Sequence, residues 1–218
     1  MKLNQKWIQS GILAGACAAA LVFTGCAGTP ADPAVGMASS VTQASKNLES
    51  SKTAISASLT SLNQLVSQPA GDLRDQYKKY LDSVKDLEKI SAKTDASVQS
   101  MLDKSELYFA DWGNKIDAIN DPALKQLSAD RKQTAVANLA DLKTSVDKAR
   151  DAFKPLMSDF NDVGTYLANN LTTAGIEGMK PRLAAAKLDA VSVRDALNGV
   201  ALNLNKFSTT LAQPAPAK

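Results

Sequence analysis

One cysteine, Cys26, stands where its thiol could be acylated. Two lysines, Lys2 and Lys6, precede an apolar stretch from Gly11 to Phe23, and two small residues then lead to the cysteine. A charged start, a short apolar segment and small residues before a cleavage point are typical of a secretory signal. With cysteine directly after that point, the pattern is that of a bacterial lipoprotein signal. It predicts cleavage before Cys26 and attachment of lipid to its sulfur.

Two other interpretations of this segment compete. A plain secretory signal would leave Cys26 as a free thiol or in an odd disulfide. Cleavage before Cys17 would leave an apolar segment too short to act as a signal. The stretch from Ile8 to Phe23 is also shorter than the roughly 20 apolar residues that a membrane-spanning helix needs. We therefore expect residues 1–25 to be a signal peptide and Cys26 to carry the lipid.

The predicted lipid implies a membrane location. Several acyl chains on one cysteine form a strong anchor, since each buried methylene contributes roughly 0.8 kcal/mol. Ala27 follows Cys26, whereas aspartate at that position retains enteric lipoproteins in the inner membrane. By this resemblance we expect the protein on the periplasmic face of the outer membrane, with the inner membrane as the less favoured alternative.

The composition excludes several classes of chemistry. The 218 residues contain no histidine, and the second cysteine lies in the signal peptide. Ser-His-Asp and Cys-His catalysis and ordinary zinc sites are therefore excluded. Removing residues 1–25 leaves 23 basic and 22 acidic residues, and this balance does not favour a nucleic-acid partner. We expect no enzymatic activity, no metal and no cofactor besides the covalent lipid.

The rest of the chain is dominated by helical patterns. Residues 26–38 contain Pro30 and Pro33 and are predicted to be an extended, lipidated tether. Residues 39–212 form the predicted helical domain, and residues 213–218 a flexible tail. Apolar residues within the domain alternate at spacings of three and four, which lays one apolar stripe along each helix. This pattern predicts helices over residues 39–67, 73–119, 122–167 and 183–211.

Short connections make consecutive helices antiparallel, so the prediction is an all-α, elongated antiparallel four-helix bundle. Asp121 and Pro122 mark the start of the third helix as N-cap and first helical residue. Pro155 lies inside that helix and predicts a kink rather than a break, because the apolar stripe keeps its phase. The second and third helices are the longest, so their hairpin should protrude beyond the others on the membrane-facing side.

Aromatic residues gather just before the tip of that hairpin. Tyr108 and Trp112 continue the apolar stripe of the second helix and are predicted to close its end. Phe109 and Ile116 fall beside the stripe and are predicted to be exposed. We therefore take Phe109, Trp112 and Ile116 as candidate contacts for a protein or envelope partner.

Small polar residues interrupt the same stripe at Ser91, Thr94 and Ser105. The main hypothesis is a non-catalytic, structural or protein-interaction role in the envelope. The alternative is a small-ligand or metal-binding helical module, with its site inside this weak part of the seam. Helices of this length can also pair between chains, which leaves a homo-oligomer open.

The stretch from Tyr108 to Ile176 resembles a bacterial family known only as a domain of unknown function, DUF2959. The resemblance is carried by Asp111-Trp112, by residues 120–128, by the run from Lys148 to Val163 and by the run from Tyr166 to Ile176. It implies a secreted or lipid-anchored helical protein without known activity. It provides no catalytic residues to transfer.

Overall fold

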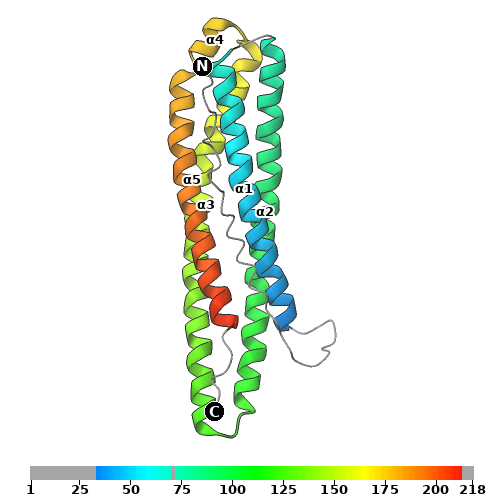
Figure 1. Ribbon diagram of the computed structural model, residues 1–218, viewed down its shortest axis with the longest axis vertical. Coiled ribbons are helices and arrows are strands. Elements are labelled where there is room, and N and C mark those ends of the chain that lie inside the picture. The colour runs from blue at the N-terminus through cyan, green and yellow to red at the C-terminus, as the bar shows by residue number, and fades with distance from the viewer. Residues whose placement is uncertain (1–32, 70–71, 213–218) are drawn as a thin grey trace, which may run out of the picture.

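Residues 33–69 and 72–212 are described by a computed structural model. They form five α-helices, of which four are long and run antiparallel to their neighbours (Figure 1). The helices are α1 (Pro33–Ser67), α2 (Leu73–Asp117), α3 (Pro122–Asn169), α4 (Thr173–Glu177) and α5 (Lys180–Ala212). The predicted all-α fold is confirmed. Cys26, the signal peptide, the first part of the predicted tether and the tail at 213–218 lie outside the described residues.

Side-chain caps fix where the two longest helices begin. Asp121 accepts hydrogen bonds from the backbone N–H groups of Ala123 and Leu124 at 2.9 and 3.1 Å. Pro122 is the first residue of α3, where its missing N–H leaves no hydrogen bond unmade. Asp72 caps α2 in the same way. The predicted start of the third helix is therefore confirmed.

The first helix begins earlier than its proline content suggested. α1 starts at Pro33, six residues before the predicted start at Ser39, so the C-terminal part of the predicted tether is helical. Proline is well accommodated in a first turn, because its fixed φ already suits a helix. Met37, in this added segment, is only 1% exposed. Packing of its side chain therefore extends the bundle by more than one turn.

The connection between α3 and α5 is also more ordered than a loop. Gly175, which falls between the predicted helices 122–167 and 183–211, lies in the short helix α4. Thr172 caps α4 by accepting a hydrogen bond from the Gly175 N–H at 3.1 Å. A Cβ atom on Gly175 would lie only 2.0 Å from the Asn170 carbonyl oxygen. Glycine is required here because the chain crosses its own backbone so closely.

Each of the four long helices packs mainly against two of the other three. α2 packs mainly on α1 and α3 mainly on α5, whereas the α1–α5 and α2–α3 pairs make far fewer contacts. α3 runs without interruption through Pro155. The predicted apolar stripes supply the core, and its largest fully buried side chains are Tyr80, Phe160, Phe207, Met37, Ile55, Leu62, Leu65, Leu87, Met101, Leu142, Leu156 and Leu167.

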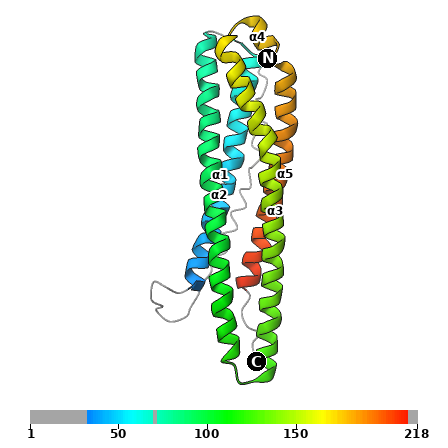
Figure 2. The same ribbon diagram turned by 180° about the vertical axis from the view of Figure 1, so that it is seen from behind.

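The α2–α3 hairpin extends beyond the start of α1 and the end of α5 (Figures 1 and 2). This overhang was predicted from the helix lengths and is confirmed. The level of the α1 start is marked by Ser105, whose Oγ lies 3.4 Å from the sulfur of Met37. Among the described helices, none combines the length and hydropathy needed to span a membrane.

Candidate functional site

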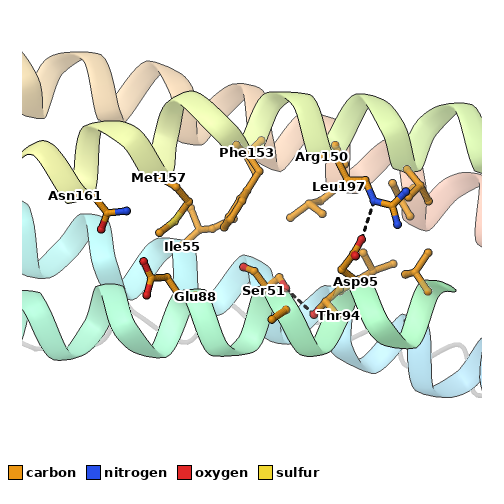
Figure 3. A pocket seen from close by; sticks show the side chains of 18 residues that line it. Ser51, Ile55, Glu88, Thr94, Asp95, Arg150, Phe153, Met157, Asn161 and Leu197 are labelled. Carbon is orange, nitrogen blue, oxygen red and sulfur yellow. Dashed lines mark hydrogen bonds and ion pairs between the residues drawn. The ribbon is translucent and has the colours of Figure 1, made fainter. Parts of the chain in front are cut away.

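The sparse contact between α2 and α3 leaves a cleft halfway along the bundle. Its volume is about 410 Å³, within the range of roughly 300–1,000 Å³ that is usual for small-molecule sites. All four long helices contribute to its lining (Figure 3). The residues that form most of the lining are Leu48, Ile55, Val98, Val146, Ala149, Phe153, Met157, Val193, Leu197 and Val200.

The cleft exists because α2 carries small polar residues at this level. Thr94 turns its hydroxyl toward α1, where it lies 2.8 Å from Ser51 Oγ and donates to the Asn47 carbonyl oxygen at 3.0 Å. Ser91, one turn earlier, is too short to reach α3. The α1–α2 side is therefore closed by hydrogen bonds, while the space toward α3 is left unfilled.

An ion pair spans one end of the cleft. The Arg150 guanidinium on α3 donates from Nε to Asp95 Oδ1 on α2 at 2.7 Å and from Nη1 to Asp147 Oδ1 at 3.2 Å. The hydrogen bond to Asp95 is the main cause of a raised pKa at Arg150. Figure 3 shows this pair reaching across from one wall to the other. Arg150 thus bridges the two helices without filling the space between them.

Two tyrosines bridge α2 and α3 beyond the other end. The Tyr80 hydroxyl donates to the Phe160 carbonyl oxygen at 2.6 Å, and the Tyr77 hydroxyl donates to the Gly164 carbonyl oxygen at 2.8 Å. Burial raises the pKa of both phenols, and that of Tyr80 strongly. Both tyrosines therefore act as neutral donors that hold the two helices together.

Between the cleft and these tyrosines, the groove continues along the same edge. Glu88 on α2 and Asn161 on α3 stand at the junction, on opposite walls (Figure 3). They also line a second hollow of about 680 Å³, which extends past Leu81 to Gly164. A Cβ on Gly164 would approach Leu81 to 3.1 Å, so glycine lets the Leu81 side chain pack closely on α3 at this level.

The lining of the cleft offers mainly apolar side chains. No group of three or more metal-ligating side chains occurs in the part of the chain that the structure describes. Of the three residues in the predicted weak seam, Ser91 and Thr94 line the cleft. Ser105 does not, because its hydroxyl donates to the Met101 carbonyl oxygen at 2.8 Å inside the closed core. The cleft favours a small apolar ligand over the metal in the alternative hypothesis.

The prediction that two residues of the hairpin, one aromatic and one aliphatic, are exposed is wrong. Phe109 and Ile116 are 8% and 7% exposed. Phe109 packs edge-on against Phe207 of α5, with ring centroids 6.2 Å apart. Trp112 is partly buried, and its Nε1 donates to Ser128 Oγ at 3.1 Å. Of the three candidate contacts, only Trp112 keeps part of its surface accessible.

The error arose from the register of one stripe. The three-four alternation reaches Ser105 by a step of four, so its next step of three leads to Tyr108. A second step of four leads instead to Phe109, and then to Trp112 and Ile116. The prediction instead placed Tyr108 in the stripe. At this level α2 faces both α3 and the end of α5, so its buried face is wider than a two-helix seam. Tyr108 is partly buried at the side of that wider face.

The α3 wall of the cleft was not predicted as part of a site. Its position follows from the turn at 118–121, because antiparallel residues at equal distances from a turn lie side by side. Counting outward from Asn120 places Ala149 opposite Ser91 and Val146 opposite Thr94, and all four line the cleft. The weak seam and this count together could have identified the wall.

Comparison with known proteins identifies a family but no activity. No curated protein and no solved structure matches the chain. Residues 35–211 match a family described as "Protein of unknown function (DUF2959)". The match includes all four walls of the cleft and the whole hairpin, and it extends the resemblance noted from Tyr108 to Ile176 over nearly all of the bundle. The chain therefore belongs to the DUF2959 family.

Proposed function

We propose that the protein is a non-catalytic envelope protein, anchored by acyl chains on Cys26 to the periplasmic face of the outer membrane. In this proposal the bundle acts by contacting a protein or another envelope component. The overhang of the α2–α3 hairpin is the observation that carries it, because this hairpin extends toward the anchored end of α1.

The overhang is comparable with the reach of the tether. From Ser105, level with Met37, α2 continues twelve residues to Asp117, or roughly 18 Å. Pro33 lies about 6 Å below Met37, so the hairpin passes it by roughly 12 Å. Six residues lie between Cys26 and Pro33, so the two Cα atoms can be at most about 25 Å apart. An upright bundle would hold its tip within roughly 13 Å of the lipid surface, close enough to meet membrane-bound partners.

The non-catalytic part of the proposal rests on the side chains available. The sequence has no histidine. The lining of the cleft is mainly apolar, and its cationic residue Arg150 is engaged by two carboxylates. No nucleophile beside a general base is found in this lining.

The anchor is tested by acylation of matched cysteine variants. Cells producing the wild type, Cys26→Ala or Cys17→Ala are labelled with radioactive palmitate, and their membranes are fractionated. We expect label in the wild type and in Cys17→Ala, and none in Cys26→Ala. Label that persists in Cys26→Ala, or an unlabelled and freely soluble wild type, would contradict the anchor.

The partner is tested by photo-crosslinking in intact cells. A photoreactive amino acid replaces Asn114 at the exposed hairpin tip or, as a control, Leu188, which is 72% exposed on α5. We expect a reproducible crosslinked species from Asn114 and not from Leu188. A second copy of the chain would count as such a partner. Equal or absent crosslinking at both positions would contradict a role for the hairpin.

A further inference from the structure

The α2–α3 cleft is an unfilled space beside a core of large, fully buried side chains. Protein interiors are normally packed as densely as organic crystals. Here, about 410 Å³ stays open between Val98, Val146 and Phe153. The Oγ atom of Ser91 is buried at this site and has no hydrogen-bond partner among the residues that the structure describes. An apolar space with an unpartnered hydroxyl indicates that the cleft is completed by a group outside the described residues.

The shape of the cleft limits what that molecule can be. On α2 the lining runs from Glu88 to Val98, which is roughly 15 Å at 1.5 Å per residue. A volume of about 410 Å³ over that length gives a mean cross-section of roughly 27 Å². This is close to the cross-section of one extended hydrocarbon chain, whereas a fused-ring ligand is wider. Met157 on the wall adds an adaptable surface suited to a flexible chain.

The charges at the rim suit a headgroup of both signs, because Lys85 lines the continuing groove beside Glu88. Arg150 is already bound by Asp95 and Asp147, so it offers no surplus positive charge to an anionic head. Glu88 lies at the end where the groove continues, is exposed, and has no hydrogen bond or ion pair among the described residues. Its carboxylate favours a head that carries an ammonium group, and the Asn161 amide opposite can donate to a phosphate oxygen.

We propose that the cleft binds one free, single-chain zwitterionic lipid, a lysophospholipid with an ammonium-bearing head such as lysophosphatidylethanolamine. The acyl chain lies between α2 and α3, and the head remains at the rim beside Glu88 and Asn161. Most of the affinity comes from burial of the chain. This site does not require the lipid anchor on Cys26, and the two can fail separately.

The test uses isolated cell envelopes that contain the full-length protein. A lysophosphatidylethanolamine with a photoreactive group in its chain is added, and adducts are mapped by peptide mass spectrometry. We expect adducts on peptides spanning 88–98 and 146–161. Absence of adducts from both peptides would overturn the proposal.

Two matched serine variants test the fit. Ser91→Leu fills the cleft with the side-chain type that the same stripe carries at Leu87, so the fold is kept and its melting temperature rises. Ser97→Leu is the control, because Ser97 Oγ is also buried without a partner but lies outside the cleft lining. We expect adduct yield to fall roughly tenfold in Ser91→Leu, the effect of excluding about two methylenes. Equal yields in Ser91→Leu and the wild type would overturn the site.

Two further comparisons identify the occupant. Unlabelled lysophosphatidylethanolamine should compete better than oleate in the wild type. This preference should shrink by roughly two- to fivefold in Glu88→Gln, as expected for one exposed charge pair. Equal competition by the two lipids would overturn the headgroup assignment. Adducts that form only in Cys26→Ala would show that the protein's own acyl chains occupy the cleft, and would overturn a free lipid.

Discussion

The two faces of α2 show how differently one helix can be packed. Toward α1, the seam is closed by large apolar residues and by hydrogen bonds, such as that of Ser58 Oγ to the Ser83 carbonyl oxygen at 2.9 Å. Toward α3, the helices are joined near Asp95 and again near Tyr80, with a cleft between. The difference arises from side-chain length: hydroxyl groups close the first gap and are too short for the second. An open seam can therefore exist within a stable bundle when its ends are held.

The largest expected contrast is between equal truncations on the two sides. Leu62→Ala, in the fully closed core, should lower the free energy of unfolding by about 2–5 kcal/mol, because it leaves a new cavity. Met157→Ala, on the half-buried wall of the cleft, should lower it by about 1 kcal/mol or less, since the space beside it is already open. Urea denaturation measures both. Equal losses would mean that the cleft is closed in solution.

The tyrosine bridge gives an intermediate effect with a characteristic pH dependence. Tyr80→Phe should lower the free energy of unfolding by about 1 kcal/mol, the net value of one hydrogen bond. Burial raises the pKa of Tyr80 above its usual 10.0 in the folded protein. Its contribution is therefore complete below pH 10 and is lost as the pH rises further, because the unfolded state releases its proton first.

Denaturation at several pH values separates the two tyrosines. Between pH 9 and 11, the stability of Tyr80→Phe should fall less steeply than that of the wild type. Tyr77→Phe is the matched control, since Tyr77 is less buried and its pKa is raised in the same direction. The expected change in slope is smaller for this variant. A Tyr80→Phe slope that equals the wild-type slope would contradict a buried, neutral Tyr80.

The ion pair at the other end should contribute least. Asp95→Asn should lower the free energy of unfolding by about 0.5 kcal/mol or less, because both partners are more than one third exposed. The loss should shrink further at high salt. A double-mutant cycle with Arg150→Gln isolates the pair. A coupling energy well above 1 kcal/mol would show that this end is as firmly closed as the Tyr80 end.

Local signals in the sequence predicted most of the fold. The Asp121 cap and the three-four alternation depend on neighbouring residues alone, and they correctly located α2, α3 and the overhang. The start of α1 at Pro33 was missed because a proline is compatible with both an extended tether and a first helical turn. Burial of Met37 decided between them, and that packing involves residues far along the chain.

Only the α2 wall of the candidate site was predicted from the sequence. Ser91 and Thr94 marked the α2 wall because they break an apolar stripe. The α3 wall carries ordinary core residues such as Val146 and Phe153, which become a cleft surface only because nothing opposite reaches them. Phe109 was misplaced for a related reason: a stripe shows that a helix is buried, and it does not show how many neighbours bury it.

Pro155 makes α3, one wall of the cleft, easier to bend at one level than at others. It lies between Phe153 and Met157, which both line the cleft, and it supplies no amide hydrogen to the preceding turn. α3 therefore lacks one backbone hydrogen bond at the level of the cleft. Bending α3 at Pro155 is expected to cost less free energy than bending it elsewhere along the helix. We expect any change in the width of the cleft that keeps both end contacts in place to bend α3 at Pro155.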